Sequence, residues 1–250
     1  MNFTKPGIIL FLFICISYAS IAQDQKDTLK VLFVGNSYIF VSNIPQLASQ
    51  ISDSTNTKLL TSMSTVGGAR LSYHWRGERG LQTKEIIKNG DFDIVVLQEQ
   101  SLGTIEYPDS FFIYANKLCD YIKACGAKPY FYMTWARERI PQQQKIISTA
   151  YQKAAKENDA GIVRVGEAWA LARQLRPDVE LYMFDGSHQS PLGAFLSACM
   201  FVGAFTAEVP EKLPPWYSIL DSNGERVSLL FENRMDITFC IKVASEFIGK

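Results

Sequence analysis

The sequence predicts an α/β protein in which five strands form one parallel sheet with helices on both faces. Five short apolar runs bounded by turn-forming residues are typical of buried strands. The stretches between them have the apolar spacing of helices, so strands and helices alternate along the chain. No internal repeat or low-complexity linker interrupts this alternation. With 250 residues, 47% hydrophobic and 20% charged, the chain has the size and composition of one folded domain.

The strands are predicted from apolar runs that end in polar or glycine-containing loops. Proline near the start of the fourth run is compatible with a strand, because the first positions of a strand tolerate a missing N–H. The expected strands are Lys30–Val34, Lys58–Met63, Phe92–Leu97, Lys128–Trp135 and Gly161–Val165.

The helices are predicted from apolar residues spaced three or four apart and from capping residues. The first begins with Asn43 as a cap and an early Pro45. A proline-rich loop, 209–217, precedes the last one. The expected helices are 43–51, a polar helix near 80–88, 111–125, 146–154, 167–176, 192–206 and one within 225–247.

The N-terminus has the pattern of an export signal. Lys5 precedes an uncharged apolar run, 7–16, that is too short to span a membrane comfortably. A small-x-small site, Ser20-Ile21-Ala22, and a polar stretch follow. We therefore expect a signal peptide over 1–22, cleaved after Ala22, and a single domain over 23–250. An uncleaved membrane anchor is the alternative. The expected location is secreted or periplasmic, with no membrane association after cleavage.

The composition gives little support for macromolecular partners or cofactors. Lys+Arg and Asp+Glu both number 25 and no basic cluster stands out, so no nucleic-acid partner is expected. Two distant histidines and the absence of paired-cysteine spacing argue against a metal, and no glycine-rich phosphate motif is present. The oligomeric state is left open. Four cysteines after the signal are expected to be mostly free, buried thiols: Cys119, Cys125, Cys199 and Cys240.

Ser37 is the candidate nucleophile. It follows the first strand, and ligand crevices in open α/β sheets lie at the carboxyl ends of strands. Taken alone, Ser37 could simply cap a helix. A hydroxyl nucleophile needs a base and a carboxylate that orients the base. Asp185 and His188, three residues apart, can meet in one turn and leave a ring nitrogen for Ser37. His74 has no carboxylate at such a spacing, although the sequence does not exclude it.

Two further loops follow strand ends. Gly67-Gly68 follows the second strand, where glycine allows close backbone approach. Gln98–Ser101 follows the third strand. Aromatic and basic residues in neighbouring loops could border the crevice and suit a sugar ring, while ordinary packing is the alternative for each: His74, Trp75, Tyr107, Trp135 and Arg137.

Two motifs together resemble the SGNH (GDSL-type) hydrolase family. Val34-Gly35-Asn36-Ser37 closes the first strand, with Gly-Asn-Ser where that family usually has Gly-Asp-Ser, and Asp185-x-x-His188-x-x-Pro-x-Gly lies near the end. The resemblance covers roughly residues 30–206. It implies a flavodoxin-like three-layer α/β/α sandwich with a central five-stranded parallel sheet. It also implies Ser37 as nucleophile, His188 as general base and Asp185 as its orienting residue.

The same resemblance implies an oxyanion hole formed by the backbone N–H groups of Ser37 and Gly68, with Gly67 as alternate. The family's third donor, an asparagine in Gly-x-Asn-Asp, is absent, and Gln98-Glu99-Gln100-Ser101 stands there instead. A glutamine amide can donate the same bond, so Gln100, or alternatively Gln98, is expected to replace it. Losing such a donor costs about 10²–10³ in rate. The expected substrate pocket includes Asn36, His74 and Trp135.

These observations predict an exported serine esterase that cleaves a short acyl ester, such as O-acetyl on a carbohydrate, through an acyl-enzyme on Ser37. The substrate class rests on export and on family analogy. One alternative is an O-acyltransferase that passes the acyl group to a glycan. Another is a non-catalytic carbohydrate-binding domain on the same scaffold, suggested by the missing Gly-x-Asn-Asp.

Overall fold

The computed structural model describes Met1 and residues 26–249, so nearly all of the expected signal peptide lies outside the described residues. Its centre is a five-stranded sheet of order β2-β1-β3-β4-β5 in which every neighbouring pair is parallel. This confirms the predicted sheet. The strands are β1 (Asp27–Gly35), β2 (Thr57–Thr65), β3 (Ile94–Leu97), β4 (Lys128–Tyr132) and β5 (Gly161–Val163).

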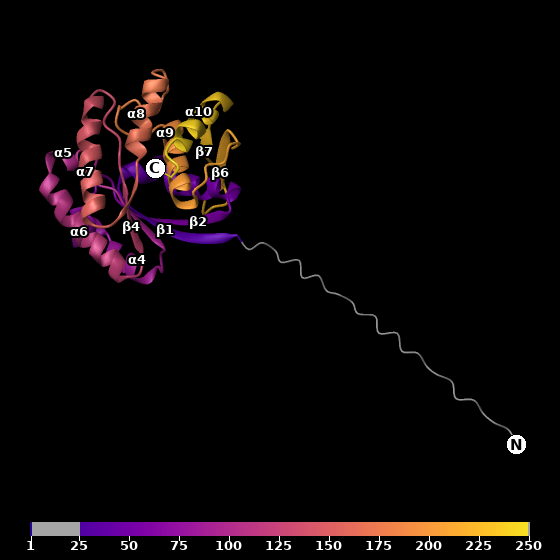
Figure 1. Ribbon diagram of the computed structural model, residues 1–250, viewed down its shortest axis with the longest axis horizontal. Helices are drawn as coiled ribbons and strands as arrows, with labels where there is room; N and C mark the ends of the chain where they lie inside the picture. Colours follow the sequence, from indigo (N-terminus) through magenta and orange to yellow (C-terminus); the bar gives the residue numbers. More distant parts are fainter. Residues whose placement is uncertain (2–25, 250) are drawn as a thin grey trace.

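Helices cover both faces of the sheet and complete three layers (Figure 1). Side chains of β1 alternate between two apolar cores: Val31 and Phe33 pack with α2, α8, α9 and α10, while Leu32 and Val34 pack with α3, α4, α6 and α7. The α/β/α sandwich is thereby confirmed. The helices are α1 (Ser37–Phe40), α2 (Ile44–Ile51), α3 (Leu71–Arg76), α4 (Thr83–Asn89), α5 (Gly103–Glu106), α6 (Pro108–Ala124), α7 (Gln144–Glu157), α8 (Val165–Leu175), α9 (Pro191–Thr206) and α10 (Arg234–Ser245), with 3₁₀ turns at 41–43, 52–54, 78–80 and 141–143.

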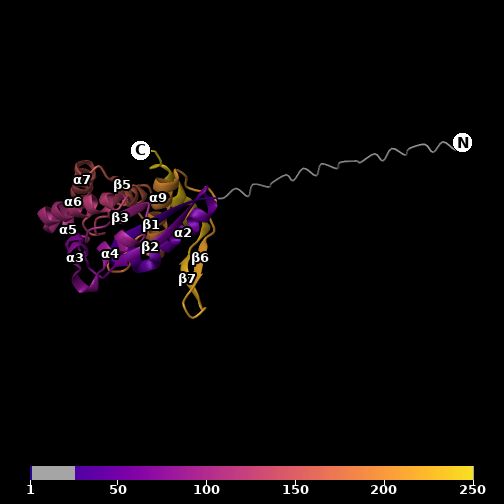
Figure 2. The ribbon, with the colours of Figure 1, turned by 90° about the horizontal axis from the view of Figure 1, so that it is seen from below.

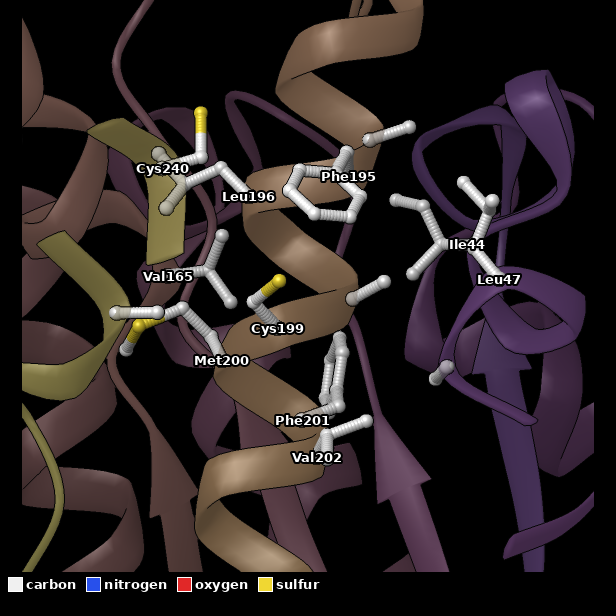
Figure 3. Packing of buried hydrophobic residues seen from close by; sticks show 14 of the residues in the cluster. Ile44, Leu47, Val165, Phe195, Leu196, Cys199, Met200, Phe201, Val202 and Cys240 are labelled. Carbon is white, nitrogen blue, oxygen red and sulfur yellow. The ribbon is translucent and has the colours of Figure 1, made fainter. Parts of the chain in front are cut away.

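Helix α9 is apolar on all sides because it is enclosed by the sheet and by other helices. Phe201 meets the ring of Phe33 edge-on at 4.9 Å and that of Tyr132 at 4.8 Å. Figure 3 shows Ile44 and Leu47 of α2 on one side of α9 and Cys240 of α10 on the other. The segment that carries Asp185 and His188 leads directly into this enclosed helix.

Two features differ from the predicted elements. His74 and Trp75 belong to helix α3 and not to a loop, and the polar helix begins later, at Thr83. The segment expected to hold only a loop and a final helix also contains an antiparallel hairpin, β6 (Trp216–Leu220) and β7 (Arg226–Phe231). It projects from the body of the molecule in Figure 2. Its turn ends in Gly224 at φ +80°, a conformation that favours glycine.

The four cysteines expected to be mostly free are all free thiols, as predicted. Cys119, Cys199 and Cys240 are buried, whereas Cys125 is half-buried at the end of α6. Burial raises the pKa of the Cys119 thiol to about 12. Separately, within residues 26–249 no helix has the length and apolar character needed to cross a membrane.

Candidate active site

The loop after β1 brings three strand ends together. The Asn36 amide donates to the carbonyl of Ala69 at 2.9 Å, and its oxygen caps α1 by accepting the Tyr38 N–H at 3.1 Å. The Asn36 N–H donates to Gln98 Oε1 at 3.0 Å. A Cβ on Gly35 would lie 2.3 Å from that oxygen, so only glycine fits there. Asn36 therefore links the loops after β1, β2 and β3.

Ser37, His188 and Asp185 form one hydrogen-bonded chain. His188 Nε2 lies 2.9 Å from Ser37 Oγ, and His188 Nδ1 lies 2.5 Å from Asp185 Oδ2. Asp185 Oδ1 also accepts the N–H groups of Ser187 and His188, both at 2.9 Å. The structure thus brings together three residues from opposite ends of the chain, in the order that a hydroxyl, its base and an orienting carboxylate require.

The charge on Asp185 sets the state of the histidine. Partial burial by itself raises the pKa of Asp185, but the hydrogen bonds from the His188 ring and from the two N–H groups lower it to about 2. Because an ionised carboxylate can only accept, His188 Nδ1 carries a proton, and Nε2 is free to accept one from Ser37. The side chains of His188 and Asp185 are 32% and 36% exposed, so the site is open to a substrate.

Trp135 supports the loop that carries His188. Its Nε1 donates to the carbonyl of Ser187 at 2.9 Å. The indole stacks between Trp169, at 3.8 Å between ring centroids, and Tyr38, at 4.6 Å. With 1% of its surface exposed, Trp135 cannot offer a face to a sugar, so its predicted place in the substrate pocket is wrong.

The predicted places of His74 and Asn36 in the substrate pocket are also wrong, because both side chains are buried. His74 is fully buried, with Nδ1 2.7 Å from Thr83 Oγ1 and Nε2 3.0 Å from the Gly35 carbonyl. Burial lowers the pKa of His74 to about 4, which leaves the ring neutral at pH 7. Asn36 is 2% exposed and uses its amide within the fold. Both residues shape the end of β1 from inside, and neither exposes its side chain to a substrate.

Two backbone donors lie in the loops that follow β1 and β2. The register pairs Gly35 of β1 with Thr65 of β2, so the loops after these strands are neighbours. Across residues 26–249, the N–H groups of Ser37 and Gly68 have no protein acceptor. Gly68 has φ +69°, which favours glycine. The Gly67 carbonyl is held by Arg79 at 2.8 Å, and this fixes the turn.

The two glutamines after β3 differ. Gln98 has no exposed surface, its amide oxygen accepts the Asn36 N–H and its amide nitrogen donates to the Glu99 carbonyl, so its burial keeps it from a substrate oxyanion. Gln100 is half-buried and donates to Ser101 Oγ at 3.1 Å while accepting the Leu102 N–H at 2.9 Å. One amide hydrogen of Gln100 remains without an acceptor in the described chain, so its predicted role stays a prediction.

The sequence reasoning missed Glu99, which joins two of the loops. Its carboxylate accepts the Gln100 N–H at 2.7 Å and the Leu71 N–H, at the start of α3, at 3.3 Å. Burial raises the pKa of Glu99 to about 7, although these bonds and Arg70 act in the opposite direction. No local pattern marks Glu99, because its role depends on the approach of a loop some thirty residues away.

The remaining crevice candidates divide between packing and rim positions. Trp75 packs edge-on against Tyr121 in the helical layer, at 6.3 Å between ring centroids. Tyr107 is 42% exposed, with the Arg70 guanidinium 3.6 Å above its ring. Among the described residues, no group of three His, Cys, Asp or Glu side chains is placed to hold a metal ion. A cavity of about 400 Å³ lined by Tyr130, Gly161 and Phe247 does not include the triad.

Comparisons with known proteins agree on the fold. No protein-family model and no curated protein matches the sequence. A protein from Slackia heliotrinireducens described as an SGNH hydrolase is 25% identical, with a TM-score of 0.61, over 71% of this chain and 99% of its own. A DUF4886 family protein from Bacteroides uniformis is 19% identical, with a TM-score of 0.71, over 88% and 94%. An acetyl xylan esterase, AlAXEase, is 14% identical, with a TM-score of 0.57, over 71% and 100%.

The chain therefore has the fold of the SGNH hydrolases, and the predicted resemblance is confirmed. The neighbour at 25% identity is described as a hydrolase. On the shared fold, this protein carries Gly-Asn-Ser in the loop after β1 and Gln-Glu-Gln-Ser in the loop after β3.

Proposed function

We propose that this protein is an exported serine esterase that cleaves a short acyl ester through an acyl-enzyme on Ser37. The observation that carries the proposal is the continuous chain Asp185–His188–Ser37, with contacts of 2.5 and 2.9 Å, at an exposed edge of the sheet. Export is inferred from the signal pattern over 1–22.

The chemistry follows from this order of groups. Ser37 Oγ attacks the ester carbonyl carbon as His188 Nε2 takes its proton, and Asp185 stabilises the resulting imidazolium. The N–H groups of Ser37 and Gly68 donate to the tetrahedral oxyanion. The C–O bond to the alcohol then breaks, and the alcohol takes the proton from His188. Water, activated by the same base, hydrolyses the acyl-enzyme and restores Ser37.

The proposed substrate is a short acyl ester such as O-acetyl on a carbohydrate. An acetyl xylan esterase shares this fold, which supports the proposal by analogy. Because His188 and Asp185 are about one-third exposed and Ser37 is half-buried, a sugar hydroxyl can also reach the acyl-enzyme. Transfer to a glycan is therefore the second candidate, and product analysis with a glycan acceptor distinguishes it from hydrolysis.

The test compares Ser37→Ala with Ser222→Ala, which removes an exposed hydroxyl in the β6–β7 turn. With 4-nitrophenyl acetate, Ser37→Ala is expected to lower kcat by about 10⁴-fold or more, and Ser222→Ala to leave it unchanged. A fluorophosphonate should label the wild type and Ser222→Ala but not Ser37→Ala. Equal turnover in the wild type and Ser37→Ala would overturn the proposal. Acyl-glycan as the main product would favour the transferase.

A further inference from the structure

Four polar side chains that the triad does not use gather beside it. They are Tyr38, Ser101, Arg137 and Ser187, which we name the Arg137 cluster. The hydroxyls of Tyr38 and Ser187 are 2.7 Å apart, and Arg137 Nη2 lies 3.5 Å from Ser101 Oγ. Ser101 and Arg137 also act on the Tyr38 phenol, so the four groups form one cluster.

The cluster is attached to the triad from two sides. Tyr38 follows Ser37 directly, and its ring meets the His188 ring edge-on at 5.5 Å. The N–H of Glu138, the residue after Arg137, donates to the carbonyl of Gly186 at 2.9 Å. Gly186 lies between Asp185 and His188 in the turn. A group bound by the cluster would therefore lie close to an ester held at Ser37.

The Arg137 guanidinium has few partners. Within residues 26–249 it forms no ion pair, and the one hydrogen bond of this side chain is the long contact to Ser101. Its Nε is buried without an acceptor. Burial raises the pKa of Tyr38, so the phenol stays neutral and supplies no negative charge. A half-buried guanidinium with so few partners is costly to maintain, and an anion on its terminal nitrogens would offset that cost.

We propose that Arg137, assisted by Ser101, binds a carboxylate of the substrate, so that the preferred ester is acidic. The terminal nitrogens of a guanidinium match the two oxygens of a carboxylate, and the Ser101 hydroxyl can add a third donor. The carboxylate belongs either to the alcohol, as in an acylated uronic acid, or to the acyl group, as in a dicarboxylic half-ester. This inference specifies the substrate class of the function proposed above and rests on it.

The first experiment measures binding, which needs no turnover. Methyl glucuronide is compared with methyl glucoside, and monomethyl succinate with methyl butyrate, by ligand-observed NMR titration of Ser37→Ala protein. One carboxylate probe is expected to bind about 10- to 100-fold more tightly than its neutral partner. Adding Arg137→Gln should abolish the preference. Adding Arg139→Gln, the same charge change at an exposed site two residues away, should preserve it.

The second experiment measures turnover in the protein with Ser37 intact. The acyl arm pairs 4-nitrophenyl hemisuccinate with 4-nitrophenyl butyrate, and the alcohol arm pairs acetylated methyl glucuronide with acetylated methyl glucoside. Arg137→Gln is expected to raise KM about 10-fold or more for the charged member of one pair. For the neutral members, kcat/KM should stay within about twofold of the wild type.

Each outcome decides one of the two proposals. Equal losses on charged and neutral members, or no preference for either carboxylate probe in binding, would overturn the role of Arg137. Arg137-dependent carboxylate binding in a protein that hydrolyses no ester would support the carboxylate site and reject the esterase. If turnover of neutral esters required Ser37 and no carboxylate was preferred, the esterase would be supported and the carboxylate site rejected.

Discussion

The two histidines of this chain lie near the same strand end and have opposite surroundings. His188 is about one-third exposed and lies between the Asp185 carboxylate and the Ser37 hydroxyl. His74 is fully buried between the Thr83 hydroxyl and the Gly35 carbonyl, two residues before Ser37. A histidine can therefore be a proton carrier or a packing residue. Its exposure and the chemistry of its partners decide between the two roles, and the residue type does not.

The partners explain the difference. An ionised carboxylate stabilises a positive imidazolium, so His188 can accept a proton during a reaction. His74 is fully buried between two neutral partners, so charging it is unfavourable, and its pKa falls to about 4. It nevertheless holds the carbonyl of Gly35 and thereby supports the backbone that leads to Ser37.

Replacing His188 should remove activity and leave the fold intact. His188→Gln is expected to lower kcat/KM on 4-nitrophenyl acetate by about 10⁴- to 10⁶-fold, because within residues 26–249 His188 is the base hydrogen-bonded to Ser37 Oγ. The free energy of unfolding should change by less than about 1 kcal/mol, since the side chain is partly exposed. Steady-state kinetics and urea unfolding measure both quantities. Activity within tenfold of the wild type would show that His188 is not the base.

Replacing His74 should have the reverse effect. His74→Leu places an apolar side chain in the core, removes the side-chain partner of the Gly35 carbonyl and leaves the Thr83 hydroxyl with Ser64 alone. Unfolding free energy should fall by about 3 kcal/mol. Activity per folded molecule should fall less than about tenfold, because the ring does not reach the substrate. If urea unfolding gives wild-type stability while activity is lost, the two histidines have been assigned the wrong way round.

The smallest expected effect is a pH dependence in which two buried groups oppose each other. Folded Glu99 has a pKa raised by burial to about 7 from 4.5. As pH rises through this window the unfolded chain releases a proton that the folded one keeps, and stability falls. His74 has a pKa lowered by burial to about 4 from 6.5. Between these two pKa values the unfolded chain binds more protons at His74 than the folded chain does, so the free energy of unfolding rises with pH.

Because the two contributions cover nearly the same pH range with opposite sign, the wild type should show little net change from them between about pH 4 and 7. In Glu99→Gln, unfolding free energy should rise by about 2–3 kcal/mol over this window, and in His74→Leu it should fall by a similar amount. Urea unfolding across the pH series tests both variants. If the unfolding free energies of the two variants changed with pH in the same direction, the opposed contributions of Glu99 and His74 would be contradicted.

Local patterns in the sequence predicted all five strands of the sheet and most of the long helices. The apolar runs that predict the five strands and the spacing that predicts α2, α6, α7, α8 and α9 involve residues a few positions apart, so the sequence alone carries them. The hairpin β6–β7 was missed although its turn, Asp221 to Gly224, is a hairpin signal between two apolar runs. Helix α3 was missed because it is short and follows a glycine turn without a side-chain cap.

Neighbours along the chain suffice to predict the parallel sheet, the position of Ser37 after β1 and the pairing of Asp185 with His188. The partners of Asn36, Gln98 and Arg137, in contrast, follow from the tertiary fold. It also decided that His74 and Trp135 are buried. These outcomes depend on contacts between residues that are tens of positions apart or more, and burial converts a polar or aromatic side chain from a ligand-binding group into a structural one.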